Sequence, residues 1–122
     1  MSKKTAIFGA TTNPGRYAFL AAERLHSHNH EIIPIGIKKG VVFGSEILNL
    51  REKPGIENLH TITMYIGPQN QKEWENYIIS LAPQRIIFNP GAENSALQKA
   101  AENKGIETLN ACTLVMLASG LY

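Results

Sequence analysis

The segment that runs from Gly9 to Arg16 has the residue types of an anion-binding loop. Gly9 and Gly15 permit a tight turn and a close approach of a ligand to the backbone. If a helix begins here, its first backbone N–H groups and the positive end of its dipole favour negative charge. An ordinary strand-to-helix turn is the alternative, because Thr11 stands where the dinucleotide fingerprint has its second glycine. The loop side chains that add hydrogen-bond donors or positive charge are Thr11, Thr12, Asn13 and Arg16.

A pair of lysines, Lys38 and Lys39, follows an isoleucine-rich segment that we predict to be the second strand. An NAD site would place an acidic residue at this strand end to bind the ribose hydroxyls. Glu31 has roughly the right sequence distance, but it lies at the start of the strand. Two lysines beside an adenosine ribose suit a ribose phosphate, either the 2′-phosphate of NADP or the 3′-phosphate of coenzyme A (CoA). A solvent-exposed lysine pair without a ligand is the alternative.

The segment Asn89-Pro90-Gly91 follows the fourth predicted strand and repeats the Asn-Pro-Gly of residues 13–15. We expect the fourth strand to lie beside the first strand in the sheet, so that the two loops face each other across one crevice. Because Asn-Pro-Gly is also ordinary turn chemistry, two independent turns are the alternative.

The remaining titratable residues do not form a recognisable catalytic or metal-binding set. His26, His28 and His30 alternate in a polar segment that we place at the opposite end of the strands, where simple solvent exposure explains them. Cys112, the single cysteine, has no evident base beside it and lacks the partners of a zinc site. We therefore expect a binding protein without a metal rather than an enzyme.

These candidates belong to a chain in which buried-strand patterns alternate with helix patterns. In the first helix, Tyr17 begins the apolar stripe that should face the core. Asn70 would cap the second helix with Glu73 reaching back, and Gly105 would end the third. The predicted strands are 5–10, 31–37, 60–66, 85–89 and 106–109, and the predicted helices are 16–25, about 70–82, 94–104 and 112–117.

Apolar strands that alternate with helices predict a parallel sheet covered on both faces. Right-handed crossovers then give an α/β fold, a Rossmann-like, doubly wound and mainly parallel sheet of five strands in the order 3-2-1-4-5. The candidate loops all follow the carboxyl ends of strands, where such sheets bind ligands. The segment 38–59 is aperiodic and contains several glycines. It is either a functional loop or an irregular replacement for a crossover helix.

Length and composition limit the classes of protein that fit. A chain of 122 residues predicts a single domain, residues 1–122, and a net charge of +2 is too small for a typical nucleic-acid binder. No apolar run reaches the roughly 20 residues that cross a membrane, and no signal peptide is recognisable. One cysteine cannot form an internal disulfide, which favours the reducing cytoplasm. Apolar residues within 114–121 suit either a homodimer or partner contact or the closure of the core.

The candidate residues described above make the chain resemble the stand-alone CoA-binding domain family. That family is itself similar to the N-terminal CoA-binding domain of succinyl-CoA synthetase alpha subunits. The resemblance covers about residues 5–117 and is most specific in residues 9–18. The other matching residues are Ile33-Pro34-Ile35 leading to Lys38, then Gly44, Pro90-Gly91-Ala92-Glu93-Asn94, Gly105-Ile106 and Cys112.

The resemblance implies a module that binds CoA or an acyl-CoA by its nucleotide and phosphates and catalyses no reaction. Residues 10–13 and Arg16 would receive the phosphates, and residues 34–39 would line the adenosine part. The second domain of the synthetases, which carries a phosphorylated histidine, has no counterpart here. The candidate binding residues are Gly9, Ala10, Thr11, Thr12, Asn13, Arg16, Tyr17, Pro34, Lys38, Lys39, Asn89, Pro90 and Gly91.

Two other interpretations fit the sequence. A small NADP-binding, oxidoreductase-like protein would also use the lysine pair, although 122 residues barely complete the nucleotide-binding half of a dehydrogenase. A regulatory subunit with a vestigial pocket would fit the departures from the family pattern. These are Gly36-Ile37, where the family usually has Asn-Pro, and Gly67-Pro68, where it often has Arg-Pro.

Overall fold

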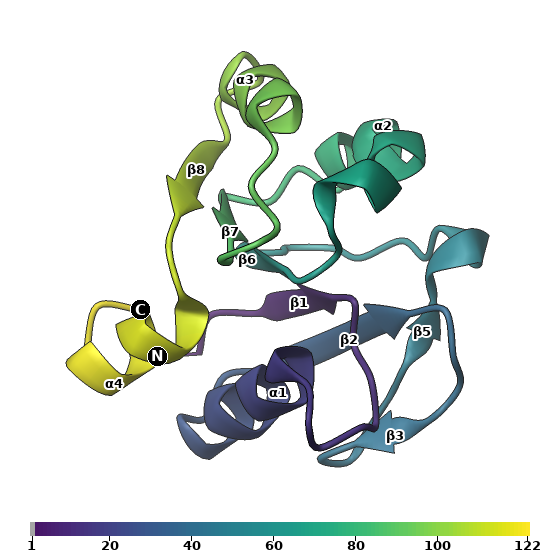
Figure 1. Ribbon diagram of the computed structural model, residues 1–122, viewed down its shortest axis with the longest axis vertical. Coiled ribbons are helices and arrows are strands. Elements are labelled where there is room, and N and C mark those ends of the chain that lie inside the picture. The colour runs from purple at the N-terminus through teal and green to yellow at the C-terminus, as the bar shows by residue number, and fades with distance from the viewer. Residues whose placement is uncertain (1) are drawn as a thin grey trace.

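A six-stranded parallel sheet forms the middle layer of the computed structural model, which describes residues 2–122. Its strand order is β5-β2-β1-β6-β7-β8, and every neighbouring pair is parallel. Figure 1 shows the strands between two layers of helices. The strands are β1 (Thr5–Phe8), β2 (Ile32–Gly36), β5 (Leu48–Asn49), β6 (Thr61–Met64), β7 (Arg85–Phe88) and β8 (Glu107–Asn110).

The predicted α/β class is confirmed, but the predicted number and order of the strands are wrong. The third predicted strand, now β6, pairs with β1 and β7 instead of lying outside β2. The place beside β2 belongs to β5, a strand of 2 residues inside the segment 38–59. A strand this short leaves no periodic pattern in the sequence, so the pattern puts the next long strand in its place. Because β6 separates β1 from β7, the loops that follow β1 and β7 do not lie on adjacent strands.

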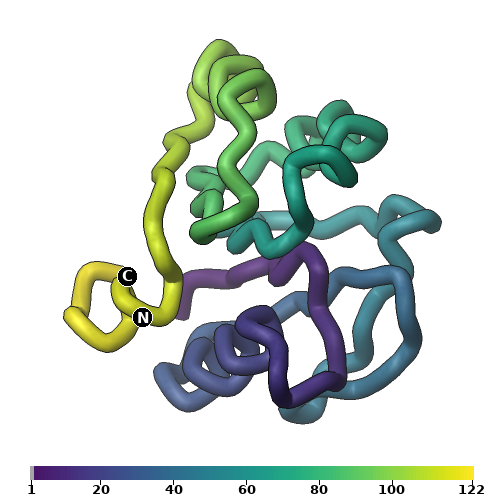
Figure 2. The backbone as a smooth tube through the Cα atoms, in the orientation of Figure 1, coloured from purple at the N-terminus to yellow at the C-terminus, as the bar shows by residue number. Residues whose placement is uncertain are grey.

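Two layers of helices cover the sheet. Helices α1 (Tyr17–Ser27) and α4 (Thr113–Ser119) contact each other on one face. Helices α2 (Glu75–Ser80) and α3 (Ser95–Glu102) cover the other face, as Figures 1 and 2 both show. Alternate side chains of each strand enter the two apolar cores: Phe8 packs toward α2 and α3, whereas Ile7 packs toward α1 and α4.

The helices begin and end close to their predicted positions, with two corrections. Tyr17 does not face the core, because it is the first residue of α1 and is 71% exposed. The second predicted helix begins instead as two short 3-10 turns, η2 (Pro68–Asn70) and η3 (Lys72–Trp74), and Asn70 forms no cap. Asn94 does cap α3 by accepting a hydrogen bond from the Leu97 N–H.

The segment 38–59 contains more structure than its sequence indicates. It holds an antiparallel hairpin of β3 (Val41–Val42) and β4 (Ser45–Glu46), the edge strand β5 and a 3-10 turn, η1 (Leu50–Glu52). Of these short elements, β5 extends the main sheet beside β2, whereas the β3–β4 hairpin forms a separate two-stranded sheet. Together they replace a crossover helix. No helix within residues 2–122 is long and apolar enough to cross a membrane.

Candidate functional site

A cleft of about 940 Å³ lies at the carboxyl ends of β1, β2, β5 and β6. Parallel α/β sheets bind ligands at this edge. The loop after β1 lies in the middle of the cleft, because β1 lies between β2 and β6 in the sheet. The segments after β2 and β5 form one wall, and the segment after β6 forms the opposite wall. The lining residues are Gly9, Ala10, Thr11, Thr12, Asn13, Arg16, Gly36, Ile37, Lys38, Leu50, Arg51, Tyr65, Ile66, Gly67, Asn70, Glu73 and Trp74.

The loop after β1 is shaped by hydrogen bonds within its own chain segment and to β2. The N–H groups of Gly9 and Ala10 both donate to the Ile35 carbonyl, at 2.9 and 3.0 Å, while Gly9 has a φ of +97°. Asn13 then forms a turn, because its Oδ1 accepts from the Gly15 N–H at 3.0 Å. These bonds direct the chain across the carboxyl end of β1 before α1 begins.

The start of α1 faces this loop and has the electrostatics of an anion site. Arg16 is the N-cap residue with an extended backbone, and no side chain within residues 2–122 caps the helix there. The first turn of α1 contains no acidic residue. The orphan N–H groups of the first turn and the Arg16 side chain therefore offer positive charge to the cleft.

Two glycines bring the β2 end into contact with the loop after β1. A Cβ atom on Gly36 would lie 2.6 Å from the Ala10 carbonyl oxygen, and one on Gly40 would lie 2.4 Å from Thr12 Cγ2. Real Cβ atoms do not approach other atoms this closely, so Gly36, which faces backbone, requires glycine, whereas a side chain at residue 40 would require Thr12 to change its rotamer. The Gly36-Ile37 departure from the family pattern thus has a packing reason in this chain.

One wall of the cleft carries Lys38 and Arg51, which follow β2 and β5. Leu50 is 2% exposed and anchors this wall to the core. Asn49 caps η1, because its Oδ1 accepts from the Arg51 N–H at 3.0 Å. Arg51 was missed by the sequence analysis, since a single arginine in an aperiodic segment gives no local signal of its position.

The opposite wall follows β6 and combines apolar and polar groups. Tyr65 and Ile66 are half-buried beside the cleft. Trp74 lines the cleft and also packs against the apolar core. Burial raises the pKa of Tyr65, so its phenol stays neutral at physiological pH. Glu73 is the carboxylate among the lining residues. This wall suits the uncharged parts of a ligand, whereas the facing wall suits its anionic parts.

Seven of the predicted binding residues line the cleft, and six do not. Pro34 is buried within β2, opposite Ile7 of β1, and Lys39 is exposed outside the lining. Tyr17 projects into solvent from α1. The residues that line it as predicted are Gly9, Ala10, Thr11, Thr12, Asn13, Arg16 and Lys38.

The Asn89-Pro90-Gly91 segment also lies outside the cleft, and Asn89 is 1% exposed. The Asn89 side-chain amide donates to Thr63 Oγ1 at 2.8 Å and to the Met64 carbonyl at 2.9 Å. Its Oδ1 accepts from the Thr113 N–H at 2.9 Å. The asparagine thus ties β6 and β7 to the start of α4. Pro90 and Gly91 are exposed.

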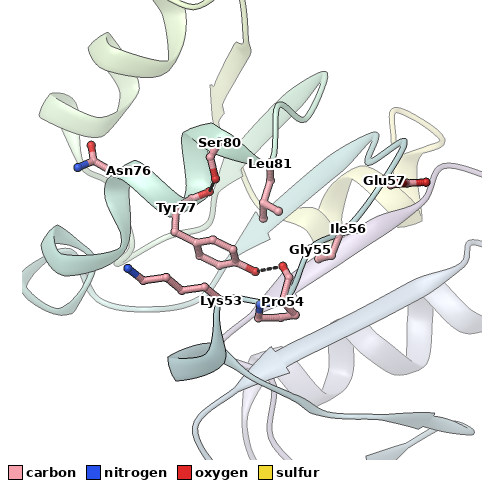
Figure 3. A pocket seen from close by; sticks show the side chains of 9 residues that line it. All are labelled: Lys53, Pro54, Gly55, Ile56, Glu57, Asn76, Tyr77, Ser80 and Leu81. Carbon is pink, nitrogen blue, oxygen red and sulfur yellow. Dashed lines mark hydrogen bonds between the residues drawn. The ribbon is translucent and has the colours of Figure 1, made fainter.

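A second hollow of about 800 Å³ lies between residues 53–57 and α2. Figure 3 shows Tyr77 reaching from α2 toward Pro54, whose carbonyl accepts from the Tyr77 hydroxyl at 2.6 Å. Burial raises the pKa of Tyr77 to about 12, which keeps this donor protonated. The polar group at the centre of the hollow is therefore already used to attach the loop to α2. No cluster of three or more His, Cys, Asp or Glu able to hold a metal occurs among residues 2–122.

The parallel sheet, with its glycine-containing loop and cleft at the carboxyl edge, places the protein among the Rossmann-like α/β domains. Within that class, the model of the CoA binding domain family matches residues 3–118. The chain therefore belongs to this family of CoA-binding domains. No match was found among curated proteins.

Solved structures agree with this fold. A crystal structure of an uncharacterized protein is 55% identical, covers 100% of this chain and 99% of its own, and has a TM-score of 0.96. A hypothetical protein from Pyrococcus horikoshii OT3 is 21% identical, with 98% and 84% of the two chains covered and a TM-score of 0.82. Aspartate semialdehyde dehydrogenase II from Vibrio cholerae is 18% identical, with 89% and 38% covered and a TM-score of 0.56. The last two likenesses concern the fold alone.

Proposed function

We propose that residues 1–122 act as a single CoA-binding domain that holds the nucleotide end of CoA, free or as an acyl thioester, in the cleft at the carboxyl edge of the sheet. This proposal rests on one observation: a single cleft is lined by the loop after β1, by the start of α1 and by the wall that carries Lys38. The lining offers positive charge, hydroxyl donors and apolar surface, which suit binding and positioning. We accordingly propose a non-catalytic binding or regulatory module of the cytoplasm.

The loop after β1 would receive the pyrophosphate of CoA. Backbone N–H groups at a helix start bind phosphate well, and Arg16 adds a charged donor on the same side. The close contact of this loop with Gly36 and Gly40 leaves the loop little freedom to move. A loop held in this way loses little conformational entropy when the ligand binds.

The wall formed by Tyr65, Ile66 and Trp74 would contact the uncharged parts of the ligand. The single tryptophan of the chain is Trp74. Its position in the cleft lining makes its fluorescence a direct reporter of occupancy. We expect CoA to change this fluorescence in a saturable manner, and calorimetry should give the same Kd.

Replacing Arg16 tests the assignment of the phosphate loop. Loss of a charge-assisted hydrogen bond costs about 1.5–3 kcal/mol, so Arg16→Ala should raise the Kd for CoA about 10-fold to 100-fold. Arg24→Ala is the matched control, because Arg24 is an exposed arginine of the same helix outside the cleft and pairs with Glu23 at 3.7 Å. Equal Kd values for the two variants would exclude Arg16 from phosphate binding.

NADP is the second candidate ligand, because a cationic wall beside the ribose would also suit a 2′-phosphate. Thermal unfolding with saturating CoA, dephospho-CoA, NADP and NAD compares the candidates directly. A ligand at a hundredfold excess over its Kd stabilises the fold by about 2.7 kcal/mol. Stabilisation by NADP without stabilisation by CoA would contradict the CoA proposal. If none of the four ligands stabilises the fold, the remaining interpretation is a regulatory subunit with a vestigial pocket. The capture of a partner protein would then test that interpretation.

A further inference from the structure

Two cations, Lys38 and Arg51, line the cleft from the ends of two neighbouring strands, β2 and β5. Strands β2 and β5 are parallel, and their last register pair joins Gly36 to Asn49. Lys38 and Arg51 each come two residues after that pair, and both line the cleft. The edge strand β5, which has 2 residues, thus brings Arg51 to the same end of the sheet as Lys38.

Among the residues that the structure describes, neither of these cations has a carboxylate partner. Within residues 2–122, neither Lys38 nor Arg51 forms an ion pair, and the acidic lining residue Glu73 belongs to the facing wall after β6. Adjacent like charges repel, and an anion placed between them relieves that repulsion and gains attraction to both. The pair is therefore arranged to receive a group with more than one negative charge, which a phosphate monoester carries at neutral pH.

The backbone that carries Arg51 is fixed. Its N–H is bonded to the Asn49 side chain at 3.0 Å, and the preceding residue, Leu50, is buried in the core. A guanidinium presents donors in a planar fork that matches two phosphate oxygens, whereas an ammonium group acts as a point charge. Arg51 can thus contribute geometric selectivity, while Lys38 contributes charge.

The distance from the loop after β1 fits two phosphate groups on one nucleotide. Strand β2 is next to β1, and β5 is next to β2, so the ends of β2 and β5, which lead to Lys38 and Arg51, lie about 5 and 10 Å from the end of β1 in the sheet. A pyrophosphate on the 5′ side and a monoester on the same ribose are separated by that one sugar ring. The cleft therefore presents two anion positions, one for each group.

We propose that Arg51, together with Lys38, binds the phosphate monoester on the adenosine ribose and makes the cleft select CoA over dephospho-CoA. This inference rests on the proposed function. Arg51 is then a specificity-determining residue, because its loss should affect only ligands that carry the ribose phosphate.

Calorimetric titration of the full chain with CoA and with dephospho-CoA tests the inference. Wild type should bind CoA at least tenfold more tightly than dephospho-CoA. Arg51→Gln should weaken CoA binding about tenfold or more and change dephospho-CoA binding less than twofold, so that the preference is lost. Arg51→Lys should keep part of the preference, since it retains the charge without the fork.

Lys53→Gln is the control, because Lys53 is a cation of the same segment that lines the second hollow instead of the cleft. It should leave the preference for CoA intact. Equal weakening of both ligands by Arg51→Gln, or an unchanged preference, would overturn the role of Arg51 while CoA binding itself stands. Wild type that binds neither ligand would refute the proposed function, and the inference with it. Thermal melts of each variant confirm that the exposed substitutions leave the fold intact.

Discussion

Gly36 lies at the point where the second strand touches the loop after the first. A Cβ atom there would be 2.6 Å from the Ala10 carbonyl oxygen, and backbone cannot move aside as easily as the end of a side chain. We expect Gly36→Ala to lower the free energy of unfolding by about 1–3 kcal/mol. It should also weaken CoA binding, because the loop that meets the phosphates must shift.

Gly55→Ala provides the matched control for this prediction. A Cβ atom on Gly55 meets nothing within 4 Å, and its φ is not positive. This substitution should be neutral or slightly stabilising, because it reduces the freedom of the unfolded chain. Urea unfolding of both variants measures the difference. If Gly36→Ala were as stable as Gly55→Ala, the contact between the strand end and the loop would not constrain the cleft.

Residue types allowed the positions of the loop after β1 and of Lys38 at the cleft to be predicted, because glycines, hydroxyls and a helix start occur consecutively in the sequence and Lys38 follows a strand pattern. Their role in anion binding stays a prediction. Arg51 could not be predicted, since its place in the cleft depends on β5, which has 2 residues and no periodic pattern. Asn89 was assigned to binding from its turn motif, but its side chain is buried and fully engaged. A motif shows what a residue can do, whereas burial decides which of those roles its side chain performs.

Individual elements were easier to predict than their arrangement. Continuous apolar runs identified five of the strands of the sheet, and Asn94 and Gly105 marked the two ends of α3. The order of the strands was not predictable from such local patterns. Pairing in a parallel sheet is decided by long-range packing, and the chain places β5, an element without a pattern, beside β2.

The buried contact between α4 and the sheet yields a prediction at the scale of elements. Asn89 joins β6, β7 and the first residue of α4, and Thr113 also bonds to Thr63 Oγ1 at 2.8 Å. Asn89→Ala would leave several of these buried groups unpaired, so it should lower the free energy of unfolding by about 2–4 kcal/mol. Because Asn89 does not line the cleft, the Kd for CoA should change less than twofold at temperatures where the variant is folded.

The control for this substitution is Asn110→Ala, at the exposed end of β8, which should leave stability nearly unchanged. Urea unfolding gives the stability, and tryptophan fluorescence titration gives the affinity. A large loss of CoA affinity in folded Asn89→Ala would return this residue to the binding site, contrary to the position that the structure gives it.

At the scale of the whole molecule, the cleft and a cluster of cations and histidines lie at opposite ends of the strands. The cleft lies at the carboxyl ends, and the cluster lies at the amino ends. Arg85, at the start of β7, lies over the Tyr122 ring at 4.4 Å and donates to Thr61 Oγ1 at 2.7 Å. His60 bonds to the same Thr61 oxygen at 2.7 Å. His30 packs on the Tyr122 ring from β2's side, with ring centroids 5.0 Å apart. Two titratable rings thus share one partly buried, positively charged environment.

This environment should make stability depend on pH. Burial lowers the pKa of His30, and the charge of Lys3 lowers it further. Burial also lowers the pKa of His60, and the charge of Arg85 lowers that value further. In addition, His30 Nδ1 accepts from the Lys3 N–H at 2.9 Å, which requires that nitrogen to be unprotonated. A lowered pKa in the folded state means that the unfolded chain binds protons more readily. The free energy of unfolding should therefore be highest above the unfolded histidine pKa of about 6.5, fall as the pH drops through it, and level off below the folded values.

Urea unfolding between pH 5 and 7.5 tests this dependence at the scale of the whole fold. Wild type should lose stability toward pH 5, and the double variant His30→Gln, His60→Gln should show a flatter profile, because it has no ring to protonate at either place. His26→Gln, an exposed histidine of α1, is the control and should retain the wild-type slope. The cluster lies at the amino ends of the strands, whereas the cleft lies at their carboxyl ends. The double variant should therefore keep the wild-type Kd for CoA at pH 7.5. Identical pH profiles for wild type and the double variant would show that these two histidines do not govern the acid sensitivity of the fold.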